Sequence, residues 1–314
     1  MVKVGVLGVG GISTAHINSW LSLEGAELAA ICDIRPEQME KWKGVRHYTS
    51  FDDMVKNEEL DIIDICLPTY LHAEYSLKAM NLGLNVLCEK PISLHPEDVR
   101  KIYEAAAKNK VNFMIAHCLR FWPEYIRLKQ VCDCGEYGKL ISGSVSRLGN
   151  RPGWSWDNWM ADEKRSGLVP FDLHIHDLDF LVYCFGKPKD YRLFRAKRPE
   201  QDFLSVTYDY GDFFITGESS WYAACHPFKS GFRFQFEKAV LAFENGKLTE
   251  YLLNGEKKEF AAAESPESGN AGIPSSNAYF NEIEYFKNCV ENRVFPDVVK
   301  ERELKDVLDI ITTF

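Results

Sequence analysis

Residues 2–13 decide the fold, and they read Val2-Lys3-Val4-Gly5-Val6-Leu7-Gly8-Val9-Gly10-Gly11-Ile12-Ser13. A short apolar run leads directly into clustered glycines and then into a helical pattern of apolar residues. Gly8 permits a tight turn without Cβ strain, and Gly10 leaves room for a pyrophosphate to approach the backbone. The following helix offers that anion free N–H groups and the positive end of its dipole. Ser13 replaces the third glycine of the pattern and is small enough for close helix–strand packing. The stretch therefore predicts a strand, a turn and a helix that bind a dinucleotide, with cofactor contacts from Gly8, Gly10, Gly11 and Ile12.

A second apolar strand, residues 27–32, ends directly before Asp33. An acid at this point can accept hydrogen bonds from both ribose hydroxyls of an adenosine and would repel a 2′-phosphate. The cofactor is therefore expected to be NAD, with NADP less favoured. Arg35 is also a cofactor candidate, because it can pair with a phosphate and so keeps NADP open. The alternative for Asp33 is an ordinary turn residue before Pro36.

Bulk properties restrict the class of protein. A chain of 314 residues is long enough for two domains or one large one. The net charge of −9 argues against a nucleic-acid partner. No apolar run is long enough to span a membrane and no signal-peptide pattern occurs, so we expect no membrane partner and a cytoplasmic location. Cys132 and Cys134 form a lone C-x-C without a second pair at zinc-ligand spacing, so no metal is expected.

Strands and helices alternate through residues 1–119, which predicts a doubly wound parallel sheet, the Rossmann arrangement. Ligands of such sheets bind at the carboxyl ends of the strands. Five stretches lie at those ends and should converge on one cleft. Further cofactor contacts are expected there from the turn at Pro68 and Thr69, from His72, and from Glu89 and Lys90. For His72, helix capping is the alternative.

The pattern changes at residue 120, and residues 120–314 are expected to form a second, α+β domain for substrate binding and oligomerisation. A strand over 140–147 and a helix over 172–184 precede consecutive strands over 191–260, which should pair mainly antiparallel in an open sheet. Residues 261–276 are expected to form a mobile loop. Helices over 278–291 and 300–313 close the chain and can pack back on the first domain. If one face of the open sheet is apolar, a homodimer or homotetramer through that face would cover it.

Two stretches carry the residues of a candidate catalytic site. Lys90 sits at a strand end before Pro91, where its ammonium can hydrogen-bond a substrate hydroxyl and stabilise a developing alkoxide. A solvated lysine is the alternative. In the helix that follows residue 171, Asp172 and His176 share a face, which suits proton transfer, and Asp179 lies near it. The alternatives are a polar helix face, or a metal site that uses His174, His176 and carboxylates.

Other polar and aromatic residues are candidates for substrate contact. His117 and Arg120 lie at the domain crossover and can touch substrate or merely brace the site. In the aromatic loop of residues 154–159, Trp156 and Trp159 can stack on the apolar face of a sugar ring, although core or lid packing explains them equally well. His16 is expected to pack in the first helix.

These motifs together resemble those of the Gfo/Idh/MocA oxidoreductases, the group of glucose-fructose oxidoreductase and inositol dehydrogenase. Residues 8–13 match its cofactor loop, residues 88–91 match its E-K-P signature, and residues 117–121 look like its R-F stretch. Residues 172–179 match its D-x-G-x-H-x-x-D helix, with His174 where glycine is usual, a change that concerns local backbone packing. The resemblance implies oxidation of a secondary alcohol of a sugar, cyclitol or related polyol by NAD(P). It also implies that His176 is the general base, that Lys90 orients the reacting hydroxyl, and that Asp172 binds substrate and assists His176.

Two other functions remain open at this stage. One is an NAD(P)-binding regulator or sensor without turnover, against which the presence of Lys90, Asp172 and His176 argues. The other is an enzyme that uses tightly held NAD for redox-assisted glycoside cleavage or epimerisation.

Overall fold

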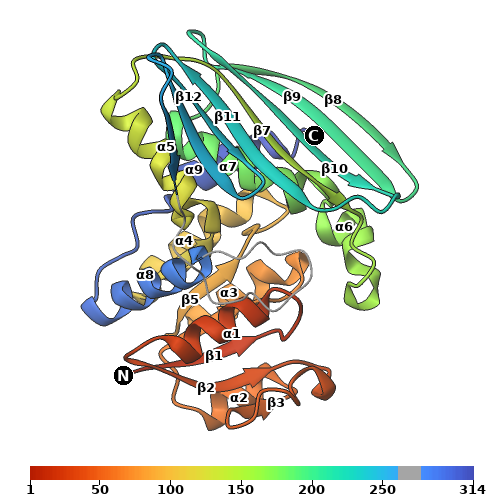
Figure 1. Cartoon of the computed structure of the whole chain (residues 1–314). Helices are drawn as coiled ribbons and strands as arrows, with labels where there is room; N and C mark the ends of the chain where they lie inside the picture. The colour runs from red at the N-terminus through yellow and green to blue at the C-terminus, as the bar shows by residue number, and fades with distance from the viewer. Residues whose placement is uncertain (261–276) are drawn as a thin grey trace. The chain divides into compact units, whose positions relative to one another are not determined.

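The computed structural model describes residues 1–260 and 277–314, so the predicted loop over 261–276 lies outside the described residues. Two units divide the chain. The first contains residues 1–118 and the described residues from 277 to 304, and the second contains residues 119–260 and 305–314. Each unit is therefore built from two separate stretches of chain (Figure 1).

The first unit is built on a six-stranded sheet with the order β3-β2-β1-β4-β5-β6. Every neighbouring pair is parallel. The carboxyl ends of the strands therefore share one edge, and the order reverses between β1 and β4, where such sheets bind ligands. The predicted doubly wound α/β fold is confirmed. The strands are β1 (Val2–Leu7), β2 (Ala26–Cys32), β3 (Arg46–Tyr48), β4 (Ile62–Ile65), β5 (Asn85–Glu89) and β6 (Phe113–Ala116).

The helices of the first unit follow from local sequence signals. Ser50 caps α2 by accepting a hydrogen bond from the Asp53 amide. Pro96 begins α4, whose buried face carries Val99, Ile102 and Ala106. Helix α8 packs against α1. A 3₁₀ turn, Pro36–Gln38, follows β2. The helices are α1 (Ser13–Ser22), α2 (Phe51–Asn57), α3 (His72–Asn81), α4 (Pro96–Asn109) and α8 (Ala278–Asn292), and a 3₁₀ turn, Thr69–Leu71, precedes α3.

The second unit holds an eight-stranded sheet with the order β14-β13-β12-β11-β7-β10-β9-β8. Its pairs are antiparallel except the inner pair β7–β10, which is parallel. The predicted open, mostly antiparallel sheet is thus confirmed. The strands are β7 (Leu140–Asn150), β8 (Asp190–Arg198), β9 (Gln201–Asp209), β10 (Phe214–Tyr222), β11 (Lys229–Phe236), β12 (Ala239–Glu244), β13 (Lys247–Leu252) and β14 (Lys257–Phe260).

Helices cover one face of this sheet, among them α5 (Pro123–Cys134) and α7 (Ile175–Phe185) (Figure 1). The opposite face mixes small polar side chains with aromatic ones, for example Ser142 beside the exposed Phe214. This face is therefore mixed in polarity, and an oligomer through it stays a prediction. Short helical segments connect the elements, namely Cys118–Phe121, Trp156–Ala161, α6 (Glu163–Ser166) and Pro170–His174, and α9 (Glu301–Ile311) runs from one unit into the other. Within residues 1–260 and 277–314, every helix is too short or too polar to cross a membrane.

Candidate active site

The loop between β1 and α1 has the geometry of a phosphate cradle. Gly8 has a positive φ of +93°, and a Cβ added there would lie 2.6 Å from the carbonyl oxygen of Cys66. A Cβ on Gly10 would meet no described atom within 4 Å, so the backbone is open there. Ser13 begins α1 and its hydroxyl donates to the Gly10 carbonyl at 2.7 Å. This loop, including Gly11 and Ile12, fits a pyrophosphate at a helix N-terminus.

Asp33 follows β2 at the same edge of the sheet and is buried. Its Oδ2 accepts a hydrogen bond from the Val9 amide at 2.8 Å, which joins the acid to the phosphate loop. Its Oδ1 accepts from the amide and Nε of Arg35 at 2.9 and 3.1 Å. The guanidinium of Arg35 partly neutralises the carboxylate, and contact of Asp33 and Arg35 with a cofactor stays a prediction.

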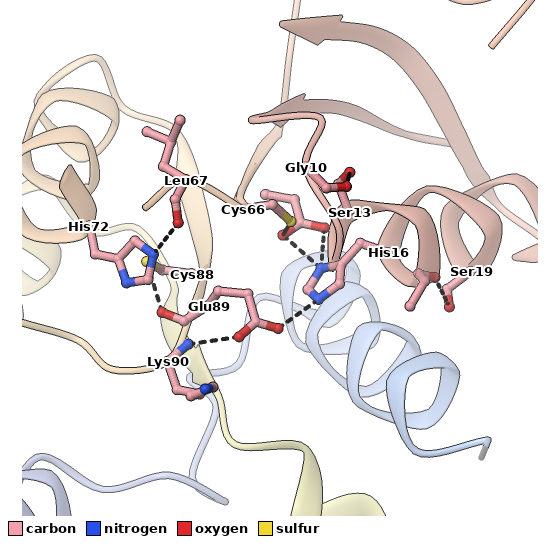
Figure 2. Close-up of polar contacts among 12 residues, drawn as sticks. Gly10, Ser13, His16, Ser19, Cys66, Leu67, His72, Cys88, Glu89 and Lys90 are labelled. Atoms are coloured by element: carbon pink, nitrogen blue, oxygen red, sulfur yellow. Dashed lines mark hydrogen bonds and ion pairs between the residues drawn. The ribbon is translucent and has the colours of Figure 1, made fainter. Parts of the chain in front are cut away.

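The turn after β5 holds Glu89, Lys90 and Pro91, and the Lys90–Pro91 peptide bond is cis. Glu89 is buried and its Oε2 accepts from the Lys90 amide at 3.0 Å, whereas the Lys90 side chain is half-buried. His72 is buried, and its ring lies 2.6 Å from the Pro91 carbonyl. The ring also lies 2.8 Å from the Leu67 carbonyl (Figure 2). Its side chain does not cap α3, so the capping alternative loses support. Pro68 and Thr69 follow β4 at the same edge, where cofactor contact stays a prediction.

His16 was expected to pack in the first helix, and it is fully buried there, within a polar cluster. Its Nδ1 lies 2.9 Å from Asp64 Oδ2 and its Nε2 lies 3.0 Å from Glu89 Oε1. The indole of Trp20 also donates to Asp64, at 2.7 Å. The sequence contained one signal for this cluster, because Asp64 lies inside the apolar strand β4 and a buried carboxylate requires donors.

In the second unit, the predicted helix over 172–184 begins as a π-helical turn, Pro170–His174, and continues as α7. Three of its polar side chains are buried against the rest of the unit. His174 contacts Tyr208 Oη at 2.7 Å and Ser219 Oγ at 3.0 Å. Asp177 accepts from Arg147, and Asp179 accepts from Arg120.

Those contacts distinguish the predicted catalytic pair from its neighbours. Asp172 and His176 are half-buried, whereas His174, Asp177 and Asp179 are buried. Because both ring nitrogens of His174 are engaged, the metal alternative that used this histidine loses one of its ligands. The roles of Asp172 and His176 in proton transfer stay predictions.

The remaining substrate candidates have different surroundings. Arg120 is buried and donates to Asp179 at 2.7 and 2.9 Å, which is the bracing role that the sequence left open. His117 is buried directly after β6. Trp156 is 40% exposed and Trp159 is half-buried. Substrate contact by these four residues stays a prediction.

Comparisons with known proteins agree with this architecture. Residues 2–117 match the oxidoreductase family with an NAD-binding Rossmann fold, and residues 125–249 match the GFO/IDH/MocA C-terminal domain. An uncharacterized oxidoreductase of Streptococcus pneumoniae is 31% identical over 190 residues, which are 59% of this chain and 51% of that protein. An inositol 2-dehydrogenase of Salmonella paratyphi B is 24% identical over 215 residues, which are 66% of this chain and 60% of that protein. The chain thus matches between half and three fifths of the length of these relatives.

The fold of the whole chain also occurs in solved structures. A levoglucosan dehydrogenase in complex with NADH and levoglucosan superposes with a TM-score of 0.82 at 16% identity, covering 99% of this chain and 95% of that one. The two family domains together account for most of the chain, in the order in which the two sheets occur. This chain belongs to the GFO/IDH/MocA family of oxidoreductases, and its first domain is of the NAD-binding Rossmann type.

Proposed function

We propose that this protein is an NAD-dependent dehydrogenase that transfers a hydride between the cofactor and a secondary alcohol of a sugar, cyclitol or related polyol. One observation carries the proposal: the Glu89-Lys90-Pro91 turn lies at the carboxyl edge of the sheet that also holds the phosphate loop and Asp33. A cationic side chain at that edge is suited to bind a reacting hydroxyl.

The cofactor would be held by the Gly8–Ile12 loop and Asp33, and it supplies a hydride acceptor when bound. The ammonium of Lys90 hydrogen-bonds the reacting hydroxyl and lowers the pKa of that hydroxyl by favouring the alkoxide. His176 accepts the proton, because neutral imidazole is a base near neutral pH. Asp172 hydrogen-bonds the substrate and orients His176. The mechanism requires Lys90 and His176 to meet at one bound substrate.

The substrate class is supported by the names of similar proteins. A relative is named inositol 2-dehydrogenase, and a structure of the same fold contains levoglucosan with NADH. Polyhydroxylated rings combine hydroxyl groups with apolar faces. Trp156 and Trp159 are suited to stack on such faces. His117 and Arg120 would either contact the substrate or brace the site.

A substrate panel tests this function directly. Purified protein is mixed with NAD⁺ or NADP⁺ and with sugars, cyclitols and their acids, and NADH absorbance is followed. We expect turnover with at least one member. Lys90→Ala and His176→Ala should each lower kcat by a hundredfold or more, and NADH affinity measured by fluorescence titration should change less than threefold.

Two matched variants serve as controls. Lys108→Ala and His47→Ala remove the same side-chain types from exposed positions of the first unit and should retain wild-type rates. Wild-type rates in Lys90→Ala or His176→Ala would contradict the assigned roles. Cofactor that copurifies and never exchanges would favour redox-assisted cleavage or epimerisation. Tight NAD binding without turnover on the whole panel would favour a sensor.

The oligomer and the compartment belong to the same proposal. We infer a homodimer or homotetramer through the open face of the eight-stranded sheet, where the small side chains of β7 permit close approach of a second sheet. All nine cysteines are free in the described residues, which suits a reducing compartment such as the cytoplasm.

A further inference from the structure

His16 connects three elements at the core of the first unit. It projects from α1 toward Glu89 at the end of β5 (Figure 2), and its other ring nitrogen contacts Asp64 on β4. Its two ring nitrogens face carboxylate oxygens, which only accept hydrogen bonds, so the ring donates from both nitrogens when it is protonated. Burial alone would lower the pKa of His16, but the charge and hydrogen bond of Asp64 raise it well above its usual value.

The second carboxylate of the cluster leads to Lys90. Glu89 Oε1 contacts His16, and its other oxygen, Oε2, accepts from the backbone amide of Lys90 at 3.0 Å. Burial opposes ionisation of Glu89, but the hydrogen bond and charge of His16 keep the pKa of Glu89 below its usual value. One carboxylate therefore joins the histidine to the backbone of the candidate catalytic residue.

His72 reaches the same turn from the opposite side (Figure 2). Its Nδ1 lies 2.6 Å from the carbonyl oxygen of Pro91, and its Nε2 lies 2.8 Å from that of Leu67. The ring thus links the loop after β4 with the residue that follows Lys90. Burial lowers the pKa of His72, and the neutral ring donates one hydrogen bond, whereas the protonated ring donates two.

We propose that His16 and His72 form a clamp on the Glu89–Lys90–Pro91 turn and are positioning residues for Lys90. The inference rests on the proposed function in assigning a reacting hydroxyl to Lys90, but the clamp itself is a property of the free protein. His16 fixes the turn through the Glu89 carboxylate, and His72 fixes it through the Pro91 carbonyl. The backbone on both sides of the Lys90 α-carbon is thereby held while the side chain stays half-buried.

Bridging contacts of this kind matter because a small displacement of a catalytic group lowers rate steeply. If a histidine only packed in the core, replacing it would lower the stability of the protein but leave the Lys90 turn unchanged. If the two histidines form a clamp, replacing either should loosen residues 86–94, which include most of β5 and the Glu89–Lys90–Pro91 turn. The two possibilities are separated by measuring that segment directly.

The first measurement is amide hydrogen exchange by mass spectrometry on the free protein. We expect His16→Gln and His72→Asn each to accelerate exchange of peptides covering residues 86–94 at least tenfold, with peptides from β1 unchanged. Tyr48→Phe is the matched control, because it removes the 2.5 Å hydrogen bond from Tyr48 to the buried Glu58 in the same unit. It should leave exchange at residues 86–94 as in the wild type.

The second measurement is kinetic and uses any substrate found in the panel. We expect kcat to fall ten- to a hundredfold in His16→Gln and His72→Asn, and the KM for NAD⁺ to change less than threefold. In a Lys90→Ala protein, His16→Gln or His72→Asn should lower kcat less than threefold further. The side chain that the histidines position is then already absent. A purely structural loss would persist in that background.

Each outcome bears on one proposal. Unchanged exchange at residues 86–94 in both histidine variants would overturn the clamp. If His16→Gln does not fold, His72→Asn decides, because its contacts are to carbonyl groups alone. A wild-type kcat in a loosened variant would overturn the positioning role. An active Lys90→Ala protein, or a panel without any substrate, would instead contradict the proposed function, and the exchange data would then decide the clamp alone.

Discussion

The carboxylate of Asp33 serves two sets of donors at once. It accepts hydrogen bonds from the Val9 amide and from Arg35, and a bound ribose would have to share it. The negative charge favours a ribose with two hydroxyls, and the nearby guanidinium weakens repulsion of a 2′-phosphate. Cofactor preference at this residue therefore depends on the pair and not on the acid alone.

Replacing Asp33 and replacing Arg35 should shift the preference between NAD⁺ and NADP⁺ in opposite directions. Arg35→Ala should raise the ratio of kcat/KM for NAD⁺ to that for NADP⁺, because the carboxylate then repels the 2′-phosphate without a counter-ion. Asp33→Asn should lower the same ratio about ten- to a hundredfold, since a hydrogen bond to a charged group contributes about 1.5–3 kcal/mol. Initial rates with both cofactors measure it. An unchanged ratio in both variants would contradict a role of the pair in cofactor choice.

The segment from Pro170 to Phe185 is the element in which the second unit presents its candidate catalytic side chains. Its π-helical turn ends at His174, which hydrogen-bonds Tyr208 on β9 and Ser219 on β10. Gly217 makes room for the ring, since a Cβ there would lie 2.7 Å from His174 Cε1. Asp172 and His176 flank this anchored residue, so the sheet fixes the backbone between them.

The burial of His174 should make the free energy of unfolding depend on pH. Burial and the charge of Arg147 lower its pKa from 6.5 to about 3. A folded-state pKa below the unfolded value means that neutral His174 stabilises the fold fully above pH 6.5, and that this contribution is lost as the pH falls toward 3. Within this window the loss is about 1.4 kcal/mol per pH unit.

The measurement compares the wild type with His174→Gln by urea unfolding at pH 6.5 and 5. The wild type should lose about 2 kcal/mol more free energy of unfolding than the variant over this interval. His47→Gln, which replaces an exposed histidine, should follow the wild type. Equal losses in the wild type and His174→Gln would show that this ring does not titrate on unfolding.

Sequence patterns located these elements better than they located their irregularities. The glycine loop, the strand ends and helix α4 carry local signals, so their positions could be predicted within a few residues. The π-helical turn at 170–174 has no such signal, because it depends on packing of His174 against β9 and β10. Likewise, the clamp joins His16, His72 and Glu89, which are far apart in sequence and show no periodicity.

At the scale of the whole molecule, alternation of strands and helices was sufficient to predict the first sheet. The second sheet was predicted as mostly antiparallel, but its one parallel pair among the described strands, β7–β10, could not be foreseen. Strand β7 is separated from β10 in sequence by α6, α7 and two further strands, so their pairing depends on contacts between distant parts of the chain. Residue periodicity shows which face of a strand is buried and does not identify its partner.

The open face of that sheet also gives a prediction about assembly. Ser144 lies on β7, at the centre of the sheet, and its side chain alternates with the buried Val145. Ser144→Arg should reduce the mass in solution to that of one chain, because a long cation would separate two stacked sheets. Light scattering at working concentration measures this, with Glu104→Arg on α4 as a surface control. A monomeric wild type would contradict the proposed oligomer.

The chain passes from one unit to the other and back, so residues 305–314 complete the unit that also contains residues 119–260. The Phe314 carbonyl accepts a hydrogen bond from Arg195, and its ring lies 5.8 Å from that of His174. A chimera in which only residues 119–260 are replaced by those of a relative would therefore combine the relative's sheet with this chain's residues 305–314. A chimera intended to transfer specificity needs both stretches from the same parent.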